Sequence, residues 1–222
     1  MVVNIHEKHH PDLLLKSNPY KGEGKKLIAI GASTGGVDAI AKILQSLPRD
    51  LPPIVITQHI PGNFSTSFAQ RLNKISKLDV YEVKERVALC DSCAYLAAGG
   101  LHMILGKHCN DYYATAQEGI RISRHCPSVD VMFRSVNNVV GKNALAIIMT
   151  GMGDDGSIGI KELYDNGAYT IAQDEESCVV FGMPKQAIAK GAICEVVGLD
   201  SIIQRIQSFA QGSLKRLQES ND

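Results

Sequence analysis

The feature that most constrains this sequence is a regular alternation of short apolar runs with longer amphipathic segments. Lys26–Gly31 (KLIAIG) is a continuous apolar run, typical of a strand buried on both faces of a sheet. The next segment, Val37–Leu47, has apolar side chains at helical spacing and stops at Pro48. Because neighbouring parallel strands need a long crossover connection, usually a helix, this alternation predicts an α/β fold with a mostly parallel sheet.

The alternation continues along most of the chain and predicts a doubly wound three-layer sandwich, with helices on both faces of the central sheet. Between about 94 and 123 the sequence pattern changes to short segments separated by Gly-Gly, Gly-Lys and Glu-Gly. This pattern predicts an antiparallel hairpin insertion. The other expected strands are Ile54–Thr57, Leu78–Val83, Ala144–Met149, Tyr169–Ala172 and Glu195–Val197, and the other expected helices are Phe64–Lys74, Val129–Val140, Ser157–Asn166, Pro184–Lys190 and Leu199–Leu217.

The length favours one large domain preceded by a short arm. A chain of 222 residues is about one and a half times a ~150-residue domain. The first 24 residues are polar, broken by prolines and glycines, and show no periodicity, so we expect a flexible N-terminal arm over 1–24 and one folded domain over 25–218.

Charge and composition exclude several classes of protein. Lys plus Arg total 23 and Asp plus Glu total 23, so the broad positive surface of a general nucleic-acid binder is not expected. No apolar run approaches the ~20 residues that span a bilayer, so no membrane insertion is expected. The N-terminus does not resemble a signal peptide, and the six cysteines show no pairing framework. Together these features predict a cytoplasmic protein.

The loop after the first strand, Gly31–Gly36 (GASTGG), matches the G-x-S-x-G nucleophile elbow in the strand-turn-helix context that this motif requires. The motif would hold Ser33 at the start of a helix, where N–H groups favour developing negative charge. The alternative is a glycine-rich loop that holds a phosphate at a helix N-terminus. The loop by itself does not choose between them.

Two further loops follow buried strands and should lie at the same edge of the sheet. His59 comes directly after the second strand, either as a catalytic base or as a hydrogen-bonded structural histidine. Asp154 and Asp155 lie in the loop Thr150–Gly156 (TGMGDDG). A serine, a histidine and an aspartate at one edge are the residue types of a catalytic triad, although spacing does not choose between the two aspartates.

At these loops the sequence resembles the catalytic domain of the protein-glutamate methylesterases of bacterial chemotaxis. The resemblance runs from about Lys26 to Leu199. Its matching stretches are IGASTGG (30–36), QHIPGNFSTSFAQRLN (58–73), AYLAAGGLHM (94–103), PSVDVMFRS (127–135), MTGMGDDG (149–156) and AQDEESCVVFGMPKQAI (172–188).

The resemblance implies a doubly wound α/β fold and assigns residue roles. Ser33 would be the nucleophile, His59 the general base and Asp155 the orienting acid, with Thr34 beside the nucleophile and the Met152 N–H at the oxyanion site. The implied substrate is a glutamate γ-methyl ester on the cytoplasmic helices of a methylated chemoreceptor, and relatives also deamidate receptor glutamines. No metal or organic cofactor is implied.

The sequence also departs from the family pattern. Asp154 stands where asparagine is common, Cys126 where arginine is frequent and Ala98 where proline is common. Repulsion between neighbouring carboxylates predicts a raised pKa for Asp154 or Asp155, with activity retained. Only about 25 residues precede the first strand, against the ~120 of a receiver domain of ordinary size. We therefore expect either a stand-alone effector, open or controlled by a separate regulatory protein, or a fragment.

Other interpretations stay open at this point. The glycine-rich loops allow a nucleotide- or phosphate-binding module, and a related esterase of another signalling pathway or an inactive partner-binding effector would share the motifs. His6–His10 matches H-E-x-x-H, and Cys90-x-x-Cys93 has zinc-ligand residue types, but neither has a clear full ligand set. The candidate contacts for acidic receptor helices are Arg71, Lys74, Lys77, Arg121 and Arg124.

Overall fold

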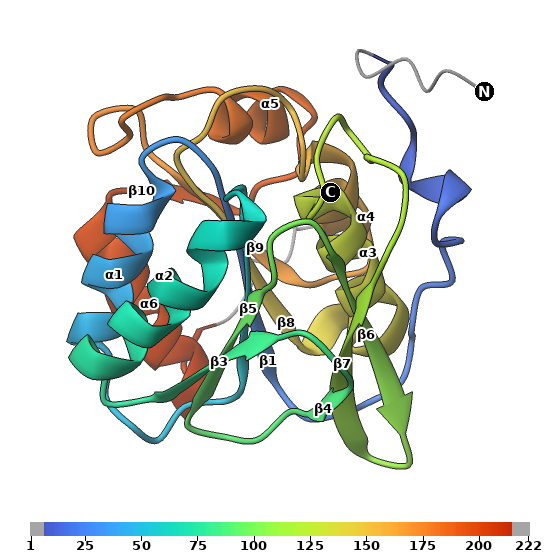
Figure 1. Ribbon diagram of the computed structural model, residues 1–222. Helices are drawn as coiled ribbons and strands as arrows, with labels where there is room; N and C mark the ends of the chain where they lie inside the picture. Colours follow the sequence, from blue (N-terminus) through green and yellow to red (C-terminus); the bar gives the residue numbers. More distant parts are fainter. Residues whose placement is uncertain (1–6, 215–222) are drawn as a thin grey trace, which may run out of the picture.

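In the computed structural model, which describes residues 7–214, a seven-stranded parallel sheet lies between two layers of helices (Figure 1). The strand order is β10-β9-β8-β1-β2-β5-β3. The predicted three-layer α/β sandwich is therefore confirmed. The parallel strands are β1 (Leu27–Ala32), β2 (Ile54–Gln58), β3 (Asp79–Val83), β5 (Cys93–Ala97), β8 (Ala144–Ile148), β9 (Tyr169–Gln173) and β10 (Glu195–Val197).

Each face of the sheet buries its own apolar core, because the side chains of a strand alternate between the two faces. Ile28 and Ile30 of β1 pack with one helical layer, and Leu27 and Ala29 pack with the other. The first layer consists of α1 (Gly36–Ser46), α2 (Gly62–Ile75) and α6 (Leu199–Gln211), and the second of α3 (Val129–Val139), α4 (Ser157–Asp165) and α5 (Met183–Ala189).

The antiparallel insertion has other bounds than the expected range of 94–123, and this boundary is corrected. Residues 93–97 form β5, a fully buried strand of the parallel sheet between β2 and β3, because its continuous apolar run suits a central strand. Residues 120–123 make only isolated bridges. The separate antiparallel sheet comprises β4 (Val87–Ala88), β6 (His102–His108) and β7 (Asp111–Gln117) in the order β4-β7-β6.

The last expected helix is also too long within the described residues. Helix α6 ends at Gln211, because Gly212 takes the left-handed conformation (φ 77°) that stops a helix. The remaining part of that prediction, beyond residue 214, lies outside the described residues. No helix in the described part of the chain is long and apolar enough to cross a membrane.

Residues 7–24 run along the second helical layer and make hydrogen bonds to it (Figure 1). They include a short 3-10 helix, η1 (Pro11–Leu13). The Tyr20 N–H donates to the Asn137 carbonyl (2.9 Å), and the Asn18 N–H donates to the Asn138 side chain (2.7 Å). The segment thus lies on the domain surface. Its division from the domain at residue 24 stays a prediction, and residues 1–6 lie outside the described residues.

Candidate active site

The three loops singled out in the sequence meet at the carboxyl edge of the sheet. Ser33 follows β1, His59 follows β2 and Asp155 lies in the loop after β8. Strand β1 lies between β2 and β8, so the order of the strands reverses beside β1. Such a switch point is where open α/β sheets form their ligand-binding crevices.

The turn that carries Ser33 is fixed by its backbone. The Ser33 N–H donates to the Thr150 carbonyl (3.0 Å), and the Ser33 carbonyl accepts from the Gly36 N–H (2.8 Å) and from Gln58 Nε2 (2.8 Å). Thr34 is exposed, and its carbonyl accepts a hydrogen bond from Thr150 Oγ1 (2.9 Å). These contacts hold the half-buried Ser33 at the start of α1.

The loop after β8 passes very close to this serine. A Cβ atom at Gly151 would lie only 2.7 Å from Ser33 Cβ, so this approach requires glycine. The Gly151 carbonyl accepts from the N–H groups of Gly182 (3.1 Å) and Met183 (2.8 Å), which fixes the loop. Met152 comes next; its side chain is 73% exposed, and its N–H has no hydrogen-bond partner in the described residues. A free donor therefore lies next in the chain to the glycine that touches Ser33.

His59 is held by Asp155 through one nitrogen of its ring. His59 Nε2 lies 2.7 Å from Asp155 Oδ2, and the two side chains are 8% and 0% exposed. Because an ionised carboxylate only accepts, this contact places the proton on Nε2 and the lone pair on Nδ1. Among the described residues, the buried Nδ1 has no hydrogen-bond partner. The His59 N–H donates to the carbonyl of Ala32, the neighbour of Ser33 (3.1 Å).

Asp155 is clamped by the N-terminus of α3. Its Oδ1 accepts from Ser128 Oγ (2.8 Å) and the Asp130 N–H (3.0 Å), and its Oδ2 accepts from the Val129 N–H (2.8 Å) as well as from His59. Unpaired N–H groups and the helix dipole make such an end a site for negative charge. Burial raises the pKa of Asp155, but His59 and these donors outweigh it, so the pKa lies below its ordinary value.

The neighbouring aspartate, Asp154, contacts other residues, so Asp155 is the one of the two that is hydrogen-bonded to His59. Asp154 forms ion pairs with Lys8 and, at 3.6 Å, with Arg124, and it is partly exposed. The expectation that repulsion from Asp154 raises the pKa of Asp155 is wrong, because His59 and the donors at the start of α3 hold this pKa below its ordinary value.

A different carboxyl group lies buried beside Asp155. Asp130 Oδ1 accepts from the N–H groups of Ile158 (2.9 Å) and Gly159 (3.0 Å), and its Oδ2 accepts from Ser123 Oγ (2.7 Å). Burial first, and the charge of Asp155 second, raise the pKa of Asp130. The sequence reasoning missed this residue and Ser128. A serine directly before a helix is an N-cap signal, and it could have pointed to Ser128.

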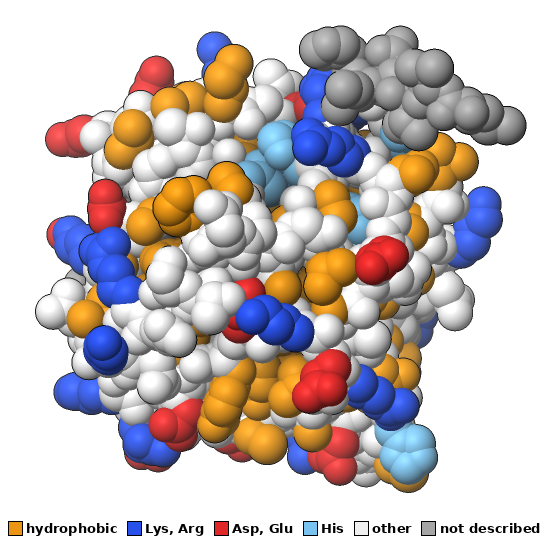
Figure 2. Space-filling view, viewed as in Figure 1, with side chains coloured by type: hydrophobic (Ala, Val, Ile, Leu, Met, Phe, Trp, Pro, Cys, Tyr) orange, Lys and Arg blue, Asp and Glu red, His pale blue; other side chains and the backbone are white. Residues whose placement is uncertain are grey.

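The surface around the site combines histidine, basic and apolar groups. Figure 2 shows histidine surface in the upper middle part of the visible face, beside Lys and Arg side chains. An open apolar groove of about 540 Å³ borders the loop after β2 and is lined by Val37, Ile60, Pro61, Phe64, Ser67, Phe68 and Arg71.

The five candidate basic contacts are not gathered in one place. Arg124 lies near the site, because it forms an ion pair with Asp154, the neighbour of Asp155. Lys74 and Lys77 lie where α2 leads into the start of β3, at the opposite edge of the sheet. These two lysines are therefore poorly placed to contact a substrate bound at Ser33.

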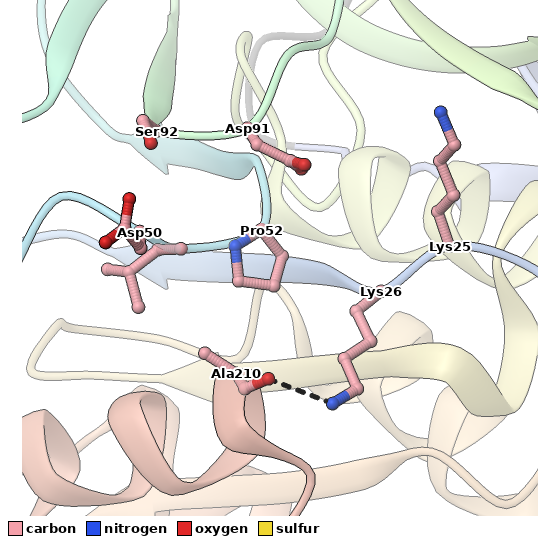
Figure 3. A pocket seen from close by; sticks show the side chains of 8 residues that line it. Lys25, Lys26, Asp50, Pro52, Asp91, Ser92 and Ala210 are labelled. Atoms are coloured by element: carbon pink, nitrogen blue, oxygen red, sulfur yellow. Dashed lines mark hydrogen bonds between the residues drawn. The ribbon is translucent and has the colours of Figure 1, made fainter.

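A second pocket lies at that opposite edge (Figure 3). It has a volume of about 490 Å³, and Lys26, which precedes β1, donates to the Ala210 carbonyl there (3.1 Å). Since Ser33 follows the same strand, this pocket is separate from Ser33, His59 and Asp155. No group of three or more His, Cys, Asp or Glu side chains able to hold a metal occurs in residues 7–214. His6 lies outside this range.

Comparisons with known proteins match both the sequence and the fold of this chain to one family. A family model described as CheB methylesterase matches residues 28–206. The chain belongs to this family. The crystal structure of the Thermotoga maritima CheB methylesterase catalytic domain superposes with a TM-score of 0.80 at 33% identity, covering 83% of this chain and 98% of that one.

Full-length relatives of the CheB family are also similar. The protein-glutamate methylesterase/protein-glutamine glutaminase of Pectobacterium atrosepticum is 50% identical over 182 residues, which are 82% of this chain and 52% of that protein. A relative with the same description from Geobacter metallireducens is 49% identical over 192 residues, 86% of this chain and 53% of that protein. The chain thus spans about half the length of these relatives.

Proposed function

We propose that this CheB-family chain is a serine hydrolase that removes the methyl group from glutamate γ-methyl esters on the cytoplasmic helices of chemoreceptors. The observation that carries the proposal is the His59 ring. Buried Asp155 holds Nε2 at 2.7 Å, and Nδ1, at the edge of the sheet where Ser33 lies, has no hydrogen-bond partner among residues 7–214. A histidine oriented in this way is a general base for a neighbouring serine.

In the proposed reaction, Ser33 Oγ attacks the ester carbonyl carbon while His59 Nδ1 takes the hydroxyl proton. Asp155 holds the ring and stabilises the imidazolium. The Met152 N–H donates to the developing oxyanion, and Thr34 supports the nucleophile from the adjacent position. The C–O bond to the methoxy group then breaks, and methanol leaves with the proton from His59.

Water completes the cycle. His59 takes a proton from a water molecule that attacks the acyl-enzyme, and Ser33 recovers its proton as the glutamate carboxylate leaves. The same steps on a receptor glutamine would release ammonia, which is the glutaminase activity named for the Pectobacterium and Geobacter relatives. None of these steps uses a metal or an organic cofactor. The proposal includes a cytoplasmic location, because the substrate helices are cytoplasmic, and it leaves room for a separate regulatory protein.

Methanol release from methylated receptor membranes tests the proposal. The wild-type chain should release methanol, and Ser33→Ala and His59→Ala should each lose a factor of at least about 1,000, as expected when one member of a cooperating triad is removed. Exposed His108, at the far end of β6, supplies the control His108→Ala, which should match the wild type. No release by the wild type, or undiminished release by Ser33→Ala, contradicts the proposal and favours an inactive effector or a nucleotide-binding module.

A further inference from the structure

A second histidine lies flat against the catalytic one. The rings of His125 and His59 are 3.6 Å apart between centroids and inclined by only 8°. Within the described residues, the ring nitrogens of His125 have no hydrogen-bond partner, so the stack is its defining contact. Because two flat faces packed this closely leave little room for either ring to tilt, each ring restrains the plane of the other.

The backbone delivers His125 to this position through a strained turn. Ile122 and His125 exchange N–H to carbonyl hydrogen bonds of 3.0 and 2.9 Å around Ser123 (φ 49°) and Arg124 (φ 70°). Two successive left-handed residues form a turn that normally takes glycine or asparagine. Side chains other than glycine adopt this conformation only where the surroundings impose it, and such strain concentrates at functional sites.

The turn is held in place by the machinery of the triad. Ser123 Oγ donates to Asp130 Oδ2 (2.7 Å), and the Asp130 N–H donates to Asp155 Oδ1 (3.0 Å). The Ser123 N–H also donates to the His9 carbonyl (3.0 Å). The turn that presents His125 and the acid that orients His59 therefore share one anchor, Asp130.

We propose that His125 is a positioning residue that holds the plane of the His59 ring and offers a neutral aromatic face to the imidazolium formed when Ser33 loses its proton. This inference rests on the serine-hydrolase function proposed above. A cation over a neutral aromatic ring is stabilised electrostatically, whereas two cations would repel each other.

The surroundings keep His125 neutral. Burial, followed by the charge of His59, lowers the pKa of His125 to about 4. The other charged groups that face it are Asp155, which acts in the opposite direction, and Arg121 and Arg124, which add to the lowering. Its ring therefore carries no charge at neutral pH, where it lies against His59.

Three variants test this role by separating the effect of the aromatic ring from the effect of the volume that it fills. His125→Phe keeps an aromatic face, His125→Leu fills the space without one, and His125→Ala removes both. We expect kcat to fall about tenfold in His125→Leu and His125→Ala with KM changed less than twofold, and to stay within about threefold in His125→Phe. His108→Ala is the control for loss of a histidine, and thermal melts show that each variant is folded.

Two measurements allow the role of His125 to be tested independently of the proposed substrate. Methanol release reports the receptor reaction, and labelling by a fluorophosphonate probe reports the reactivity of Ser33 with any substrate. If the wild type is labelled but releases no methanol, the proposed function fails while the labelling rates of the variants still test His125. Labelling rates of His125→Leu equal to those of the wild type, or of His125→Phe as low as those of His125→Ala, overturn the inference.

Nuclear magnetic resonance tests the stack without any reaction. The ring of His125 should shift the carbon-bound protons of His59 upfield, and the shift should persist in His125→Phe and vanish in His125→Leu. Absence of the shift in the wild type overturns the inference.

Discussion

At the scale of single residues, burial separates two side chains of the same chemistry. Asp155 is fully buried and accepts four hydrogen bonds, three of them from the start of α3. Asp154 is partly exposed and pairs with Lys8. The acid that can orient His59 is therefore the one whose charge the helix N-terminus stabilises.

Ser128 has two roles, since it binds Asp155 and caps α3, so a mutation at this residue should affect both catalysis and stability. Its Oγ donates to Asp155 Oδ1 (2.8 Å) and accepts from the Val131 N–H as the N-cap of α3. We expect Ser128→Ala to lower the free energy of unfolding by about 1 kcal/mol, the usual cost of losing such a cap. We also expect kcat to fall about tenfold, because a group bonded to a charge is lost.

Urea unfolding and initial rates of methanol release check the prediction for Ser128. The matched control is Ser135→Ala: Ser135 is also buried on α3, but its Oγ donates to the Met132 carbonyl. The control should keep the wild-type kcat. An unchanged kcat in Ser128→Ala would show that this bond to Asp155 does not matter for catalysis.

At the scale of elements, α3 connects the site with residues 7–24. Its N-terminus binds Asp155, and Arg134 in its middle reaches the segment before β1. The Arg134 side chain is 2% exposed; it pairs with Glu162 on α4 and Asp12 on η1, and it donates to the Leu15 carbonyl (3.0 Å). One buried cation thus joins three segments.

We expect Arg134→Ala to lower the free energy of unfolding by about 3 kcal/mol, since it leaves Glu162 without its partner in a partly buried place. Asp12→Ala should cost no more than about 1 kcal/mol, because Asp12 is half exposed and its loss leaves Arg134 paired with Glu162. Urea unfolding of the two variants under the same conditions makes the comparison. Equal losses would show that the segment before β1, rather than α4, is the main partner of Arg134.

At the scale of the whole molecule, buried histidines link stability to pH. Burial lowers the pKa of both His125 and His102 below the ordinary 6.5. The unfolded chain therefore binds more protons than the folded one once the pH falls below about 6.5. The contribution of these residues to stability is complete above that pH and is lost as the pH falls toward the folded pKa, about 4 for His125.

The expected result is a difference between two proteins. Asp130 acts in the opposite direction because its pKa is raised in the folded protein. Its contribution to stability is lost as the pH rises above 3.8, the ordinary pKa of this group. Its effect cancels when the wild type is compared with His125→Phe. Thermal melts between pH 7 and 4 should show the wild type losing stability relative to the variant as the pH falls. A constant difference would mean that His125 titrates alike in the folded and unfolded states.

The sequence by itself determined the alternation of strands and helices, and the three loops that bear Ser33, His59 and Asp155. These features are local, since a buried run or an amphipathic period is written in consecutive residues. The G-x-S-x-G motif at Ser33 is local too, because it lies within one turn.

Only the tertiary structure decided that residues 93–97 join the parallel sheet, that Asp155 rather than Asp154 is clamped by α3, and that His125 lies on His59. Strand pairing, burial and ring stacking depend on which distant segments meet. No window of neighbouring residues contains that information, because such contacts form only when the chain packs.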